Sequence, residues 1–146
     1  MADLPGLARE VLRDSYLADL GVCDAEGPWV AAVTFVHDEK DLSIYWLSQP
    51  HARHSLCIEK DGTVAAAITA AWESGKERAL QLEGHAERIP EAPAEIVESY
   101  ALKRGREKLA QMLRTLERGT VWYRLTPKRI ELIYNSFFGY DRQRVL

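Results

Sequence analysis

The 146-residue sequence has few of the features that would cross-link a fold or place it in a membrane. Its two cysteines, Cys23 and Cys57, are too few for a disulfide framework, so we expect reduced, packed thiols. No apolar run approaches the roughly 18 residues that indicate a membrane span. The start of the chain, Met-Ala-Asp-Leu-Pro-Gly, lacks the basic and apolar regions of a signal peptide. These absences predict a cytoplasmic protein that does not bind membranes.

The charge balance gives no support for nucleic-acid binding. The chain has 19 Lys and Arg against 22 Asp and Glu, a formal net charge of −3. Non-specific binding to nucleic acid needs a concentrated basic surface. The one basic run, Lys103, Arg104, Arg106 and Lys108, is typical of a solvated helix face. The alternative for this run is a phosphate-facing patch that is reached across a subunit interface.

Familiar catalytic and cofactor motifs are also absent. The sequence has no Walker A loop, no G-x-G-x-x-G and no G-x-S-x-G. Of the four histidines, only His51 and His54 share an i, i+3 spacing on a predicted helix. No third ligand accompanies them at a recognisable spacing, so no metal site is predicted. The carboxylates are scattered over turns and helix surfaces, and the catalytic residues therefore stay unknown.

The pattern that is present is that of one mainly β domain spanning residues 1–146. A chain of this length makes about one domain, and consecutive strands joined by short turns indicate a mainly antiparallel sheet. Closure into a split or complete barrel would remove its exposed edges. The pattern predicts strands over 16–23, 29–37, 42–47, 63–71, 77–89, 121–125 and 128–135, and helices over 5–14, 51–60, 93–104 and 106–117.

The segment from Ser48 to Ser55 carries the clearest chemical signal, because it joins a strand end to a helix start. The first turn of a helix offers unpaired backbone N–H groups and the positive end of the helix dipole, which together attract anions. Ser48 and Ser55 add hydroxyl donors, Arg53 adds a planar fork for phosphate oxygens, and His54 adds a further donor. The alternative is a surface helix start with incidental basic residues.

Several segments in order resemble the FMN-binding split-barrel family typified by pyridoxamine 5'-phosphate oxidase. Their order and spacing carry the resemblance, and the tail that follows them indicates a short subgroup of the family. The segments are AAVTFV at 31–36, LSIYWLS at 42–48, the helix start Ala52-Arg53-His54, LQLEGHAE at 80–87, and YRLTPKRIE at 123–131.

The resemblance implies an antiparallel split β-barrel and a set of FMN contacts. Ser48, Arg53 and His54 fall at the positions that hold the FMN phosphate, and the isoalloxazine would lie along Val33, Thr34 and Phe35. Gln81 matches a polar position before the family's glycine. Members of the family form homodimers with shared cofactor sites, and the residues expected to reach across the interface here are Trp122, Asn135 and Phe138.

The departures from the family pattern argue against the vitamin B6 oxidase reaction. The second basic position is His54, and Ala32 and His37 replace an Arg and a Lys beside the flavin strand. The substrate-contacting Arg-x-His-Asp-Arg of the family's C-terminus is replaced by Asn135-Ser136-Phe137-Phe138-Gly139-Tyr140. We therefore expect an FMN-dependent oxidoreductase with a different small-molecule substrate.

Three alternatives to this function stay open. The first is a non-catalytic homodimeric binding or stress protein that holds flavin weakly or not at all. The second is a haem-binding member of the same fold, with His37 or His85 as the axial ligand. The third is a member that binds the deazaflavin F420, whose acidic tail would need the basic run at 103–108.

Overall fold

The structure is a computed structural model that describes residues 2–105, 110, 114 and 118–146. The predicted helix over 106–117 lies outside the described residues, apart from positions 110 and 114. The described helices are α1 (Leu4–Arg13), α2 (Arg53–Lys60), α3 (Ala94–Arg104) and α5 (Asn135–Phe138). The described strands are β1 (Leu17–Asp24), β2 (Gly27–Thr34), β3 (Val36–His37), β4 (Ile44–Ser48), β5 (Thr63–Ala71), β6 (Arg78–Ile89), β7 (Val121–Tyr134) and β8 (Gln143–Arg144).

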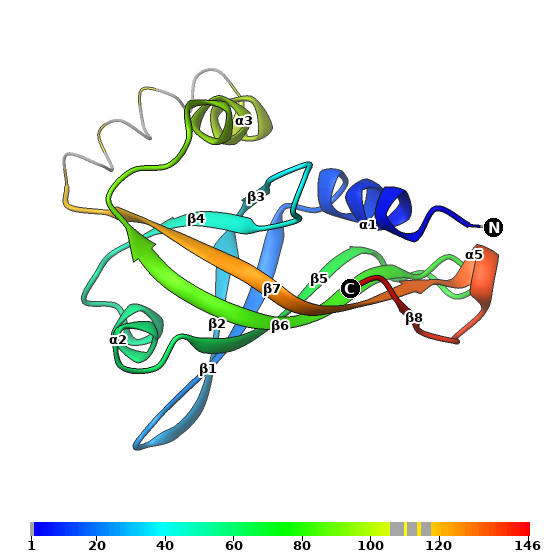
Figure 1. Ribbon diagram of the computed structural model, residues 1–146, viewed down its shortest axis with the longest axis horizontal. Helices are drawn as coiled ribbons and strands as arrows, with labels where there is room; N and C mark the ends of the chain where they lie inside the picture. Colours follow the sequence, from blue (N-terminus) through cyan, green and yellow to red (C-terminus); the bar gives the residue numbers. More distant parts are fainter. Residues whose placement is uncertain (1, 106–109, 111–113, 115–117) are drawn as a thin grey trace.

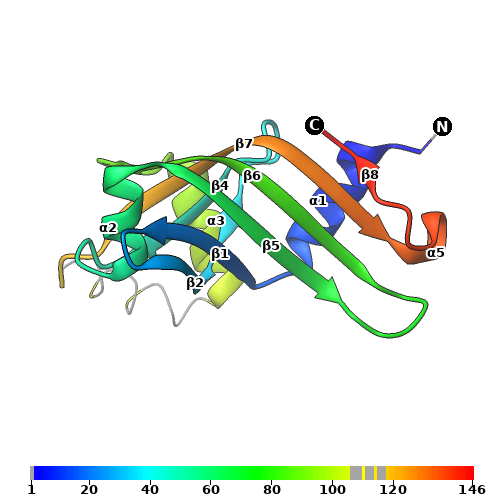
Figure 2. The same ribbon diagram turned by 90° about the horizontal axis from the view of Figure 1, so that it is seen from below.

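The strands form one antiparallel sheet that curls into a split barrel, which confirms the predicted fold class. The strand order is β2-β1-β5-β6-β7-β4-β3, and β8 pairs with β7. One residue, Phe35, separates β2 from β3, so a single length of chain pairs with β1 on one side and with β4 on the other. Among the described residues no ladder joins β2 to β4, and we call this interruption of the sheet the split. α2 lies near one end of the barrel, and α1 and α5 lie near the other (Figures 1 and 2).

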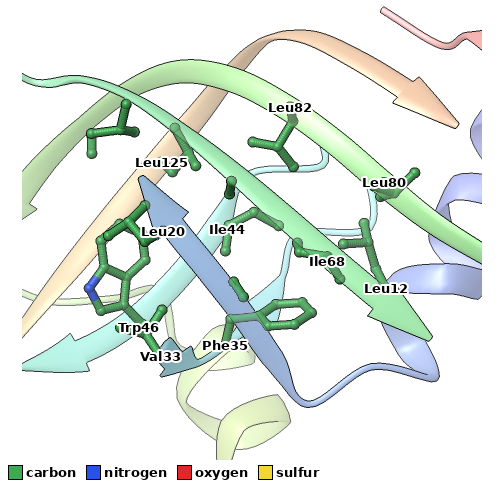
Figure 3. Close-up of a cluster of buried hydrophobic side chains, with 14 of the residues drawn as sticks. Leu12, Leu20, Val33, Phe35, Ile44, Trp46, Ile68, Leu80, Leu82 and Leu125 are labelled. Atoms are coloured by element: carbon green, nitrogen blue, oxygen red, sulfur yellow. The ribbon is translucent and has the colours of Figure 1, made fainter. Parts of the chain in front are cut away.

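The barrel interior is filled by alternate residues of the strands together with one face of α1. Figure 3 shows Leu20, Phe35, Trp46 and Ile68 pointing into this interior, and all four are at most 1% exposed. A second, smaller cluster lies under α3. Its buried members are Val36, Tyr45, Ile89, Ile96, Tyr100 and Trp122.

The main correction to the predicted elements concerns the C-terminal strands. We expected two strands on either side of Thr126-Pro127, but β7 runs through both residues without a break. Proline removes a ladder hydrogen bond, and strands tolerate it at bulges. The pairing of β6 with β7 shifts register here, with Gly84 opposite Pro127 and Glu83 opposite Arg129. The register shift therefore allows β7 to continue through Pro127.

Other departures concern single residues and the tail. Cys23 is exposed and only Cys57 is buried, so the expectation of a packed thiol was wrong for Cys23. Lys103 does not lie on a solvated face, because its Nζ donates to the Leu12 carbonyl at 3.1 Å and lies 3.9 Å from the centre of the Phe35 ring. The tail, for which no element was predicted, contains α5 and β8. Within the described part of the chain, no helix is long and apolar enough to cross a membrane.

Gly84 is needed because the backbone of β7 approaches it closely at the bulge. A Cβ atom on Gly84 would overlap the carbonyl oxygen of Thr126 and lie 2.9 Å from the Cα of Pro127. We expect Gly84→Ala to lower the free energy of unfolding by about 1–3 kcal/mol, as overpacking does in other proteins. Chemical denaturation measures this loss.

Gly21→Ala is the matched control, since Gly21 is also a strand glycine. A Cβ atom there would meet only the Ala65 carbonyl oxygen, at an ordinary 3.6 Å. We expect a change within about 1 kcal/mol. Equal losses in the two variants would contradict the role assigned to the close approach at Gly84.

Candidate functional site

The candidate site lies where β4 ends and α2 begins, beside the split in the barrel. Ser48 is the last residue of β4, and Arg53 is the first of α2. The residue before the helix, Ala52, supplies no side-chain cap. Backbone N–H groups in the first turn of α2 therefore have no capping side chain, which is the arrangement that suits an anion. We call Ser48, Arg53, His54 and Ser55 the cradle.

Two cradle residues contact each other directly. The Ser48 hydroxyl lies 2.8 Å from Nε2 of His54, within hydrogen-bond distance. Burial lowers the pKa of His54 below its ordinary value, because the charged form loses hydration. His54 is therefore neutral near pH 7. It can offer one hydrogen bond to an anion but no positive charge.

Arg53 is held by residues from the β1–β2 hairpin. Its Nε donates to Oδ2 of Asp24 at 2.9 Å, and its Nη2 donates to Oδ1 at 3.1 Å. The guanidinium carbon also lies 4.7 Å from the centre of the Trp29 ring. The hydrogen bonds from Arg53 hold the pKa of Asp24 below its usual range. Asp24 is thus a carboxylate at neutral pH, paired with the only cationic cradle residue.

Sequence reasoning did not identify Asp24 or Trp29. Asp24 stands before a predicted turn, where an acidic residue needs no special explanation. It meets Arg53, 29 positions later, only because the hairpin folds against α2. Cys57, one turn further along α2, also directs its thiol to Oδ2 of Asp24, at 3.7 Å. Burial raises the pKa of this thiol, so Cys57 is not an activated nucleophile.

Ser55 lies in the same first turn of α2 and is 1% exposed. Its hydroxyl oxygen has no hydrogen-bond partner among the described residues. Buried hydroxyl groups without a partner are uncommon, and an unplaced ligand or water is one explanation for them. The unsatisfied hydroxyl is compatible with a ligand at this end of the barrel.

The predicted flavin strand is the end of β2. Val33 and Phe35 are buried in the barrel interior, whereas the Thr34 side chain is half-buried and faces outward. Thr34 lines a pocket of about 460 Å³ together with Tyr16, Leu102, Lys103, Arg104 and Gly105. In the described chain β2 pairs with β1 alone, so the opposite backbone edge of β2 forms no strand ladder.

The remaining predicted contacts do not meet the cradle within one chain. Ser48 pairs with Val121 at the start of β7, whereas Asn135 follows the end of that strand. Gln81 is exposed on the outer face of the sheet, where its Oε1 accepts a hydrogen bond from Nε of Arg142 at 2.9 Å. Trp122 is 5% exposed and packs edge-on against Tyr100. Their roles as cofactor contacts stay predictions.

The two histidines considered as haem ligands differ in their surroundings. Nε2 of His37 lies 3.0 Å from Oε1 of Glu39, and burial lowers the pKa of the imidazole. His85 is exposed and lines a groove of about 470 Å³ that Glu83 and Lys128 also line. In the part of the chain that the structure describes, neither histidine lies in an apolar cavity that would enclose a haem.

Comparison with solved structures gives a consistent picture of the fold. A haem-binding protein from Mycobacterium smegmatis is 19% identical, with a TM-score of 0.73, and the match covers 99% of this chain and 59% of that one. A provisionally assigned pyridoxamine 5'-phosphate oxidase from Listeria innocua is 16% identical, with a TM-score of 0.65 and coverage of 90% and 98%. An FAD-binding protein from Mesorhizobium loti is 14% identical, with a TM-score of 0.62 and coverage of 84% and 87%.

The chain therefore has the split-barrel fold of the pyridoxamine 5'-phosphate oxidase-like proteins, as the sequence resemblance predicted. Proteins with this fold include both flavin-binding and haem-binding members. Comparison of the sequence with protein-family models and with curated proteins finds no match. At these identities the likeness establishes the fold, and the ligand has to be argued from the residues of this chain.

The lowered pKa of His54 predicts how stability depends on pH. The unfolded chain binds a proton at His54 below about pH 6.5, whereas the folded chain resists that proton. Stability therefore falls as the pH drops below this value. We expect His54→Gln to lose less stability than the wild type between neutral and mildly acidic pH, as measured by thermal unfolding.

His51→Gln, at an exposed position just before α2, controls for the general effect of losing a histidine. Burial also lowers the pKa of His37. Because His37 remains in both variants, it contributes equally to the pH dependence of their stability. The same pH dependence in wild type and His54→Gln would show that His54 is not held in its neutral form by the fold.

Proposed function

We propose that the chain binds FMN, with the phosphate at the cradle and the isoalloxazine along β2, and acts as a flavin-dependent oxidoreductase on a small molecule. The observation that carries the proposal is the Ser48–His54 contact at the uncapped start of α2, whose first turn also carries Arg53 and the buried Ser55. The fold supports it, because a flavin-binding protein is among the structures with this architecture.

The residues of the cradle fit a phosphate group. Asp24 accepts from two of the Arg53 N–H groups, and the others stay available as donors. Ser55 contributes a buried hydroxyl without a partner among the described residues, and the first turn of α2 contributes backbone N–H groups. The Ser48 hydroxyl, which lies within hydrogen-bond distance of His54, can rotate and donate its hydrogen to a ligand instead. When bound, FMN supplies the redox chemistry and the protein supplies orientation.

We further propose that two copies of the chain form the complete site. On the outer face of the sheet, Val30 is 64% exposed and stands in one row with Gly21 and Ala65. Leu17 is 53% exposed on the same face of β1. Exposed apolar side chains that are grouped on one face mark interaction surfaces. A twofold arrangement would let the tail of one copy, with Asn135, approach the cradle of the other.

The flavin proposal is tested by the visible absorption of the purified protein after FMN is added and the excess is removed. We expect flavin bands to remain with the wild type. Arg53→Ala should bind FMN about 10- to 100-fold more weakly, since the variant lacks the charge-assisted hydrogen bonds of the guanidinium. Lys76→Ala, which removes a charge from the exposed β5–β6 turn, is the control and should bind like the wild type.

Two outcomes would contradict the flavin proposal. If the wild type retains no flavin, the chain is not an FMN protein, and a haem band after haem is added would then favour the alternative cofactor. If flavin binds equally to the wild type and to Arg53→Ala, the phosphate does not lie at the cradle.

The dimer proposal is tested by light scattering on Val30→Glu. The wild type should have about twice the chain mass of 16.6 kDa. A buried, unpaired carboxylate opposes association, so the variant should be monomeric and should bind FMN more weakly. Trp72→Glu changes another exposed aromatic or apolar side chain, in the β5–β6 connection, and should stay dimeric. A monomeric wild type would contradict the proposal.

A further inference from the structure

The Arg53–Asp24 pair has a consequence for which flavins the cradle prefers. Asp24 and Arg53 carry opposite charges, and His54 is neutral near pH 7, so the formal charge of the group is zero. The side chains of Arg53 and Asp24 are 32% and 23% exposed, which leaves them only partly screened by water. A phosphate monoester that carries between one and two negative charges near pH 7 therefore meets side chains without net formal charge, and the partial positive charge of the α2 start remains to attract it.

We propose that Asp24 is a specificity-determining residue, which offsets the Arg53 charge so that the cradle prefers FMN to riboflavin only weakly. This inference rests on the proposed flavin site. The phosphate of FMN still gains hydrogen bonds from Arg53, Ser55 and the α2 backbone, but the carboxylate beside Arg53 repels it. The isoalloxazine and ribityl groups, which both flavins share, then provide most of the affinity.

Several contacts hold the Asp24 carboxylate beside the Arg53 guanidinium. Its two oxygens accept from Nε and Nη2 of Arg53, and the Cys57 thiol also faces Oδ2. The backbone N–H of Glu26 donates to Oδ1 at 2.9 Å. The carboxylate is fixed from three sides, and Trp29 covers one face of the guanidinium. The charge of Arg53 therefore stays paired, and the N–H groups that Asp24 does not occupy remain as donors.

Asp24→Asn separates the charge of Asp24 from its positioning role, since the amide oxygen can still accept from Arg53. We expect this variant to bind FMN about tenfold more tightly than the wild type, because removal of the carboxylate leaves a net positive charge beside the phosphate. The affinity for riboflavin should stay unchanged. Titration of flavin fluorescence with protein measures both constants.

Two further variants make the test decisive. Glu59→Gln removes the same charge from an exposed position on α2 and should leave the ratio of FMN to riboflavin affinity as in the wild type. Asp24→Ala removes both the charge and the acceptor. It should therefore favour FMN less strongly than Asp24→Asn does, because Arg53 is no longer held.

The outcomes distinguish this inference from the proposed function. If the wild type binds both flavins but Asp24→Asn binds FMN no more tightly, or tightens both flavins equally, the specificity role is wrong while the flavin site stands. A wild type that strongly prefers FMN to riboflavin would also overturn the inference. If no variant binds either flavin, the proposed function fails, and the inference fails with it.

Discussion

The continuity of the chain from β2 into β3 is the constraint on which the barrel depends. One length of backbone pairs with β1 before Phe35 and with β4 after it, so the two ends of the strand order are joined. The sheet must curl to satisfy both pairings, and a split remains between β2 and β4. α2 begins where β4 ends, beside this opening. Barrel closure therefore sets where the cradle lies relative to the β1–β2 hairpin, whereas the cradle side chains themselves come from one short segment.

The Arg53–Asp24 pair connects this closure with binding. It links the β1–β2 hairpin to the first turn of α2, across elements that are far apart in sequence. A buried ion pair is weak evidence for stability, because the cost of removing two charges from water can exceed their attraction. Here the pair orients the guanidinium beside a helix start and also limits its charge. The same contact thus shapes the site and restrains its attraction for anions.

The sequence predicted the local part of this arrangement well. Ser48, Arg53, His54 and Ser55 lie within eight positions, and a strand followed by a helix brings them together in almost any fold. Consecutive strands joined by short turns predicted the mainly antiparallel sheet. The cradle segment and the strand pattern depend on residues that are close in sequence, so the sequence alone predicts them.

The features that the sequence did not reveal depend on long-range register. Asp24 reaches Arg53 only through the fold of the hairpin, and Lys103 reaches the Leu12 carbonyl from a distant helix. The uninterrupted course of β7 through Pro127 depends on Gly84 in another strand, whose missing side chain allows the close approach. A proline taken alone predicts that a strand ends there. Only the glycine in the partner strand β6 explains why β7 continues.

The central claim is that a flavin phosphate binds at the start of α2. The phosphorus NMR signal of FMN during titration with the protein tests it most directly, because this signal reports the surroundings of the phosphate alone. The account predicts that the signal shifts or broadens with the wild type and stays near its free position with Arg53→Ala at the same protein concentration. A signal that the wild type leaves unchanged while the flavin absorption is perturbed would contradict the account, because the isoalloxazine would then bind without its phosphate at the cradle.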